Sequence, residues 1–249
     1  MENRKIVIIG ATSAIAEQCA RLWVVEEPSE MILVGRDQEK TEILACDLRV
    51  RAPCTTVTSV KADFHDPMKI QQLADEINET GSVALVLIAH GSLPGQQQCQ
   101  NQLDACRDAL EINGVSPVLF AEAFAGHMEK ANRGTLAIIG SVAGDRGRKS
   151  NYVYGAAKGL VARYAQGLQH RLAKTRVKVV LIKPGPTDTP MTALMKREGA
   201  RLASAEAVAK CIVDGVAEGK SVVYAPGKWA LIMMVVRHIP IFLFKKMDI

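Results

Sequence analysis

Short apolar runs alternate with longer amphipathic stretches along most of the chain. Seven runs rich in aliphatic residues predict strands at residues 5–9, 31–34, 55–62, 82–88, 135–140, 177–182 and 221–224. The run Lys5–Ile9 is continuous and β-branched, which is typical of a strand buried on both faces of a parallel sheet. The alternation therefore predicts an α/β domain with helices covering both faces of the sheet.

Helix signals stand between these strands. Asp37 and Ser204 stand at expected N-caps, and Asp66 is followed by Pro67 at the first helical position. A long helical stretch from about 102 to 130 contains Asn113 next to a glycine. Because asparagine is unfavourable inside a helix, this pair predicts a special local backbone there.

Composition narrows the class of protein. The chain has 249 residues, of which 48% are hydrophobic, enough for one large domain with a substantial core. The formal charge of +5 suits an anionic cofactor or a membrane surface, but the basic residues are dispersed and aromatics are only 4%, which argues against nucleic-acid binding. The N-terminus runs directly into a strand without a signal peptide, so we expect a cytoplasmic protein.

The six cysteines form no Cys-x-x-Cys pair. We interpret each of them as a small buried hydrophobic residue in a reducing compartment, and we assign no metal to the chain.

The first strand is followed by the turn Gly10–Ala16 and a helical pattern. A strand, a glycine turn and a helix N-terminus form an anion site that suits a pyrophosphate. A plain strand-turn-helix connection is the alternative.

The stretch Ser141–Lys158 has the composition of a proton-transfer site. Ser141 follows an apolar strand, and Tyr154 and Lys158 are four residues apart on one predicted helical face. Tyrosine titrates near pH ~10, and we expect the neighbouring ammonium to lower that value. A serine hydroxyl at the strand end can hold a carbonyl oxygen during the transfer.

These three residues, at these spacings, resemble the short-chain dehydrogenase/reductase family. The resemblance implies that Ser141, Tyr154 and Lys158 form the catalytic triad and that Asn113 is the fourth catalytic residue, which holds a relay water. It covers roughly residues 4 to 225. The cofactor-binding residues that it implies are Gly10, Thr12, Ser13, Ala14, Ile15, Arg36, Asp63, Phe64, Ala89, His90, Gly91, Tyr154, Lys158, Pro184, Gly185, Thr187 and Thr189.

Two of these segments depart from the family pattern. The family usually has glycine where Ala14 and Ala16 stand, and asparagine and alanine where Ala89 and His90 stand. His90 either lines the cofactor cleft or has a structural role, and we favour the structural role.

The second strand predicts the choice of dinucleotide. An NAD-binding fold usually has an acidic residue at its end, whereas this chain has Gly35 followed by Arg36. A guanidinium can bind a 2′-phosphate with two parallel hydrogen bonds, so we expect NADP(H).

The C-terminal part is unusual. Residues 228–249 form an apolar and basic segment beyond the dinucleotide-binding domain of residues 1–227, and its apolar stretch is too short to span a bilayer. Trp229, Lys245 and Lys246 suit contact of residues 229–246 with a membrane surface. The alternative is packing on the subunit or on a dimer partner.

The region 191–202 is where the family carries a mobile substrate lid. Its cations Lys196, Arg197 and Arg201 either meet an anionic substrate or are solvated.

Taken together, the patterns and the resemblance predict a single Rossmann-like doubly wound domain with a seven-stranded parallel sheet. The expected activity is NADPH-dependent interconversion of a ketone and a secondary alcohol.

Within the family the chain resembles bacterial proteins similar to decaprenylphosphoryl-2-keto-ribose reductase. This resemblance implies a lipid-linked keto-sugar as substrate and a location on the inner face of the membrane. The alternatives are a reductase of acyl, sphingoid or small soluble ketones and a non-catalytic NADP-sensing regulator. The family often forms homodimers or tetramers.

Overall fold

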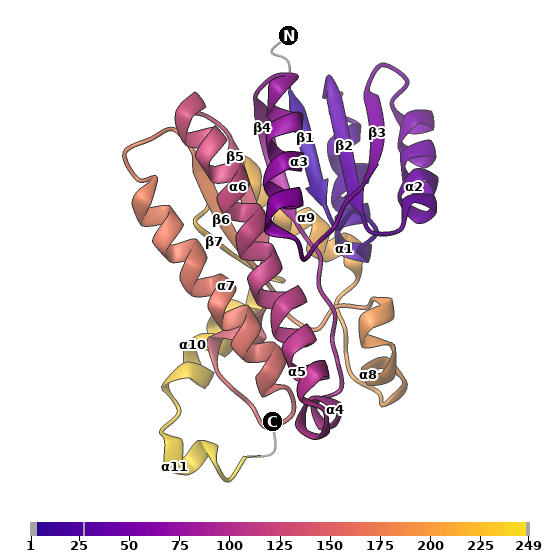
Figure 1. Cartoon of the computed structure of the whole chain (residues 1–249). Coiled ribbons are helices and arrows are strands. Elements are labelled where there is room, and N and C mark those ends of the chain that lie inside the picture. The colour runs from indigo at the N-terminus through magenta and orange to yellow at the C-terminus, as the bar shows by residue number, and fades with distance from the viewer. Residues whose placement is uncertain (1–3, 27, 248–249) are drawn as a thin grey trace.

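The computed structural model describes residues 4–26 and 28–247. Its centre is a seven-stranded parallel sheet in the order β3-β2-β1-β4-β5-β6-β7 (Figure 1). The strands are β1 (Lys5–Ile9), β2 (Glu30–Gly35), β3 (Thr56–Lys61), β4 (Val83–Ile88), β5 (Thr135–Ile139), β6 (Lys178–Pro184) and β7 (Val222–Ala225). The predicted doubly wound fold is confirmed, and each strand lies within two residues of its predicted bounds.

Helices cover both faces of the sheet because successive side chains of each strand point to opposite sides. Val7 and Ile9 of β1 belong to the core beneath one helix layer, and Ile6 and Ile8 belong to the other core. The first layer contains α3 (Pro67–Glu79), α6 (Ser116–Ala131) and α7 (Tyr152–Arg171) (Figure 1). The second layer contains α1 (Ala14–Val24), α2 (Gln38–Arg51) and α9 (Ala205–Ala217).

The predicted caps are present. The side chain of Asp37 accepts a hydrogen bond from the Lys40 amide at 3.2 Å, and that of Asp66 accepts one from the Met68 amide at 2.9 Å. Ser204 accepts from the Ala207 amide at 3.2 Å. Each cap satisfies an amide that has no partner within its helix.

The predicted helix over 102–130 is divided into several parts. It begins earlier, with α4 (Gln96–Asn101), and continues as α5 (Leu103–Leu110), a π-helical turn η1 (Glu111–Val115) and then α6. Asn113 lies in the π turn, so the expected special backbone is confirmed. Such turns inside helices are frequent at functional sites.

The C-terminal segment forms two further helices, α10 (Lys228–His238) and α11 (Ile241–Phe244). Arg146 holds them against the domain: Nη1 donates to the carbonyls of Val236 and Ile239 at 2.6 Å each, and its guanidinium lies 3.8 Å from the Phe244 ring centroid. Within 4–26 and 28–247, no helix has the length and apolarity needed to cross a bilayer.

The cysteine prediction is partly wrong. Cys19 and Cys99 are buried as expected, whereas Cys46 and Cys54 are exposed. Cys46 lies on the solvent side of α2, where its sulfur is 3.7 Å from a carboxylate oxygen of Glu42.

Candidate active site

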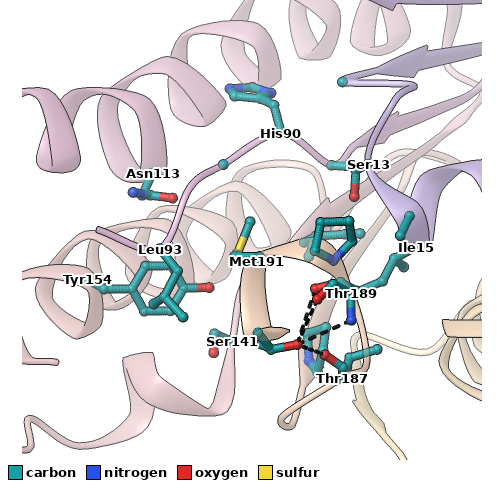
Figure 2. Close-up of a pocket in the computed structure, with 18 of the residues that line it drawn as sticks. Ser13, Ile15, His90, Leu93, Asn113, Ser141, Tyr154, Thr187, Thr189 and Met191 are labelled. Carbon is teal, nitrogen blue, oxygen red and sulfur yellow. Dashed lines mark hydrogen bonds between the residues drawn. The ribbon is translucent and has the colours of Figure 1, made fainter. Parts of the chain in front are cut away.

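A cleft of about 730 Å³ lies at the carboxyl ends of the strands. Residues that follow β1 and β4 line it, and the strand order reverses between these two strands, which is the usual ligand position in open α/β sheets. Figure 2 shows the side chains of Ser141 and Tyr154 turned toward the same space, with Ser13 and Ile15 across from them. With the exception of Asp63, every residue that the sequence assigns to the site lines this cleft.

Ser141 follows β5 at the start of the 3-10 turn η2 (Val142–Asp145). Its Oγ accepts a hydrogen bond from the Ala143 amide at 3.1 Å, which fixes the rotamer. The hydroxyl proton is therefore left to donate to another acceptor in the cleft.

Lys158 is buried one helical turn beyond Tyr154. Its Nζ donates to the Ile139 carbonyl at 3.0 Å and lies 5.9 Å from the Tyr154 ring centroid. Burial lowers the pKa of Lys158 to about 8, because removal from water disfavours the charged form. The Lys158 side chain therefore remains mostly in its charged ammonium form at neutral pH.

Tyr154 keeps its proton at neutral pH. Burial raises the pKa of its phenol above the ordinary value, and a hydrogen bond with Ser141 offsets part of that rise. The pKa of Tyr154 is therefore above its ordinary value and not below it as expected, because burial outweighs the effect of the hydrogen bond. A protonated phenol that is hydrogen-bonded to a serine is suited to act as a general acid.

Asn113 is fully buried in the π turn beside these groups. Its Oδ1 accepts from the Ser92 amide at 2.8 Å, and its Nδ2 donates to the Ala109 carbonyl at 2.9 Å. The side chain therefore ties α5 to the segment that follows β4.

The opposite half of the cleft fits a dinucleotide. Gly10 has φ +80°, and a Cβ atom there would lie 2.6 Å from the His90 amide nitrogen, so the turn requires glycine. The N-terminus of α1 faces the cleft, where its first amides have no intrahelical partner and attract a phosphate. Ala14 lines the cleft, and its small methyl group leaves room for a phosphate at the helix N-terminus. Ala16 is fully buried against the core and does not line the cleft.

His90 packs among aromatic rings at the back of the cleft. Its ring centroid is 4.8 Å from that of Phe64 and 5.5 Å from that of Phe120, and Nε2 lies 2.9 Å from the Ser116 Oγ. Burial lowers the pKa of His90 well below its ordinary value, so the ring is neutral at physiological pH. These contacts support the structural role that we favour for His90 from the sequence. His90 also lines the cleft.

The end of β2 carries Arg36, which is exposed and lies 6.0 Å from the Phe64 ring centroid. The nearby carboxylate of Asp37 is engaged by Lys40, whose Nζ is 3.3 Å away. The Arg36 guanidinium is thus the charged group at this strand end that is available to a ligand.

Asp63 does not reach the cleft. Its carboxylate accepts hydrogen bonds from the His65 and Asp66 amides at 2.9 and 3.3 Å and from Lys69 Nζ at 3.2 Å. These bonds lower the pKa of Asp63, and they close the turn before α3.

The turn after β6 forms the wall beneath the cleft. Thr187 Oγ1 donates to the Gly185 carbonyl at 2.9 Å, and the Thr189 amide donates to Thr192 Oγ1 at 3.2 Å. Trp229 packs directly on this turn, since a Cβ atom at Gly185 would lie 1.9 Å from the indole nitrogen. The tryptophan that the sequence suggested as a membrane anchor is therefore engaged with the domain.

The lid is formed by η3 (Pro190–Thr192) and α8 (Ala193–Arg197). Its contribution to the cleft includes Met191 and Met195, whereas Lys196, Arg197 and Arg201 are not among the lining residues. Lys196 instead pairs with Asp188, with Nζ and Oδ2 2.5 Å apart. Of the two alternatives, the structure thus supports the solvated one, because Lys196, Arg197 and Arg201 are all exposed.

Sequence reasoning missed a buried ion pair under the site. Lys183 Nζ lies 2.5 Å from Asp145 Oδ1, and Tyr224 donates to Asp145 Oδ2 at 2.7 Å. The two charged side chains are 6% and 3% exposed. A lysine in an otherwise apolar strand was the available signal, because a buried charge requires a partner.

Comparisons with known proteins agree with this geometry. Residues 4–199 match the short chain dehydrogenase family. An uncharacterized oxidoreductase in the mprA 5′ region of Streptomyces coelicolor is 30% identical over 246 residues, which are 98% of this chain and 96% of that protein.

Two solved structures are similar throughout. The bulky-bulky ketone specific alcohol dehydrogenase of Comamonas testosteroni has a TM-score of 0.81 at 19% identity, covering 100% of this chain and 96% of that one. A short-chain dehydrogenase of Sphingobium yanoikuyae in complex with NADPH has a TM-score of 0.80 at 20% identity, covering 98% and 96%. These two likenesses establish the fold, and the family match over 4–199 establishes the lineage. The chain belongs to the short-chain dehydrogenase family of oxidoreductases.

Proposed function

We propose that the protein reduces a ketone to a secondary alcohol, or catalyses the reverse reaction, with NADP(H). The main support is that Ser141, Tyr154, Lys158 and Asn113 meet in one cleft with a phosphate-binding helix N-terminus. Bound NADPH supplies the hydride in this reaction, and the protein supplies position and charge. Gly10, the N-terminus of α1 and the turn at Gly185 would hold the dinucleotide.

Within that scheme the chain handles the proton. The Tyr154 hydroxyl donates its proton to the carbonyl oxygen, and the Ser141 hydroxyl donates a hydrogen bond to the same oxygen. The ammonium of Lys158 stabilises the phenolate that remains, and Asn113 supports the relay that returns the proton. The raised pKa of Tyr154 favours the protonated form that this role needs.

The NADP(H) preference is supported by Arg36. NAD-binding sites usually offer a carboxylate to the ribose hydroxyls at this strand end, but the Asp37 carboxylate caps α2 and pairs with Lys40. The exposed Arg36 is suited to a 2′-phosphate.

Replacement of Tyr154 by phenylalanine tests the reaction. Tyr154→Phe should reduce ketone turnover by roughly 10²- to 10⁴-fold, which is the usual contribution of a general acid, while NADPH binding is retained. Tyr152→Phe is the matched control, because Tyr152 is 45% exposed on the same helix. Near-normal turnover in Tyr154→Phe would exclude the assignment. NADPH binding without turnover of any ketone by the unmodified protein would instead favour a dinucleotide-sensing regulator.

For the substrate we propose a hydrophobic carbonyl compound, specifically a lipid-linked keto-sugar reached at a membrane surface. The support is the outer face of α10 and α11, where Leu231, Val235, Ile241 and Phe242 are 57–64% exposed. Arg146 fixes these helices beside the segment that carries Ser141. Such a face, followed by Lys245 and Lys246, suits the inner, anionic surface of a membrane.

Vesicle binding by point variants tests the membrane contact. Phe242→Ser should weaken co-sedimentation with anionic vesicles about tenfold or more, since burial of a phenylalanine side chain is worth about 1.5–3 kcal/mol. Val50→Ser on α2 is the control, because Val50 is 81% exposed on a different helix. If the full chain does not bind the vesicles at low salt and Phe242→Ser dissociates a dimer, the segment is an oligomer contact.

A further inference from the structure

The substrate end of the cleft carries a cation to which the proposed reaction assigns no role. Four cationic residues line the cleft, namely Arg36, Lys40, Arg148 and Lys158. Arg36 directly follows β2, Lys40 lies in the first turn of α2, and Lys158 belongs to the proton-transfer group. Arg148 lies between η2 and α7, six residues before Tyr154.

The side chain of Arg148 has no partner among the residues that the structure describes. Its Nε is buried without a hydrogen bond, and across residues 4–26 and 28–247 its guanidinium forms neither a hydrogen bond nor an ion pair. Folded proteins pair nearly all of their buried polar atoms, so the unpaired Nε of an arginine that lines a cleft points to a missing ligand. Burial also lowers the pKa of Arg148, although an arginine stays charged at physiological pH.

Asn151 is left unpaired in a similar way. It is the N-cap residue of α7, and such a side chain normally accepts a hydrogen bond from the amide of the second or third helical residue. Here Gln96 takes that place: its Oε1 accepts from the Val153 amide at 3.1 Å. Asn151 therefore lines the cleft with its Oδ1 buried and without a partner.

Negative charge is missing from this end of the cleft. Among the described residues, the carboxylates that line the cleft belong to Glu17, in α1, and Asp37, which follows β2, so both lie at the opposite end. Glu17 is paired with Arg21 at 2.5 Å, and Asp37 with Lys40 at 3.3 Å. The charge of Arg148 is therefore not compensated by any lining side chain.

We propose that Arg148 and Asn151 form a substrate subsite that selects ketones carrying an anionic group. The guanidinium pairs with a carboxylate or phosphate of the substrate, and the Asn151 amide oxygen accepts from a neighbouring hydroxyl. Arginine is suited to this role, because its parallel N–H groups match both anions. The subsite deepens the proposed ketone reduction and rests on it for its substrate.

Matched pairs of ketones test the subsite. Levulinate and methyl levulinate differ by one carboxylate charge, and dihydroxyacetone phosphate and dihydroxyacetone differ by a phosphate. With NADPH, we expect the unmodified protein to have the lower KM for the anionic member of at least one pair. Arg148→Ala should raise that KM about 10- to 100-fold, the usual effect of losing a charge-assisted hydrogen bond, and should leave the neutral member within about twofold. The pair that responds identifies the anion.

Three comparisons make the result decisive. Arg148→Lys should restore part of the preference because it retains the charge. Arg201→Ala should leave both KM values unchanged, because Arg201 is exposed beyond α8 and does not line the cleft. Arg148→Gln repeats the test with a side chain of similar polarity, in case the alanine variant does not fold. Equal KM values for charged and neutral ketones, or an equal effect of Arg148→Ala on both, would overturn the subsite. If no ketone is reduced but the NADP-loaded protein binds an anionic member in an Arg148-dependent manner, the subsite stands and the proposed reaction fails.

Discussion

Replacement of Lys158 by methionine should stabilise the protein at neutral pH while it disables the proposed proton transfer. Methionine has a similar length and no charge, so it removes the cost of holding an ammonium away from water. Burial lowers the pKa of Lys158 from 10.5 to about 8. At about 1.4 kcal/mol per pKa unit, this difference corresponds to a penalty of about 3 kcal/mol at pH 7.

The hydrogen bond from Lys158 to the Ile139 carbonyl offsets part of that penalty. A neutral acceptor of this kind contributes about 1 kcal/mol, so Lys158→Met should raise the free energy of unfolding by about 2 kcal/mol at pH 7. Between pH 8 and 10.5 the unfolded chain holds the lysine proton more firmly than the folded chain does. The stability of the unmodified protein therefore rises with pH relative to the variant, and the advantage should fall to about 1 kcal/mol at pH 9 and to about zero at pH 10.

Urea unfolding of both proteins at pH 7, 9 and 10 measures these values. Lys210→Met is the control, because Lys210 is exposed on α9 and its replacement should not raise the free energy of unfolding. A variant less stable than the unmodified protein at pH 7, or a stability difference that does not change with pH, would refute the reasoning. The former result would show that the buried ammonium gains more from its surroundings than it loses by leaving water.

Three further predictions concern charge. Arg36→Ala should narrow the preference for NADPH over NADH by roughly one to two decades of affinity, measured by fluorescence titration with each dinucleotide; equal affinities in the unmodified protein would contradict the assignment. Asp145→Ala should lower the free energy of unfolding by about 3–5 kcal/mol, because it leaves the Lys183 charge buried and alone. Lys196→Met breaks an ion pair whose side chains are 62% and 40% exposed and should cost less than about 1 kcal/mol.

The parts of the site that follow local rules could be predicted from the sequence. Ser141 stands after a strand of the predicted sheet, and Tyr154 and Lys158 share a helical face because they are four residues apart. Strand ends of a parallel sheet meet at one edge, so these positions converge once the fold is fixed. The π turn at Asn113 could be anticipated for the same reason, since the asparagine conflicts locally with the helix around it.

The parts that depend on contacts between distant segments could not be predicted. Gln96 caps a helix 57 positions later in the chain, and Lys183 pairs with a carboxylate 38 positions earlier. No periodicity links such positions. Asp63 was assigned to the cleft from its strand end, but the amides of the following turn compete for its carboxylate. A short polar side chain beside a turn commonly bonds to the local backbone, and that rule outweighed the resemblance here.

The same distant contacts connect the C-terminal segment to both sides of the cleft. Arg146 binds the carbonyls at the end of α10, and its neighbour Asp145 pairs with Lys183 at the end of β6. Trp229, in the first turn of α10, packs on Gly185 in the turn that follows β6. The segment carrying Ser141 and the turn at Gly185 are thus joined twice, once by a buried ion pair and once by α10. Because α10 contacts both, it ties the C-terminal segment to the two sides of the proposed site.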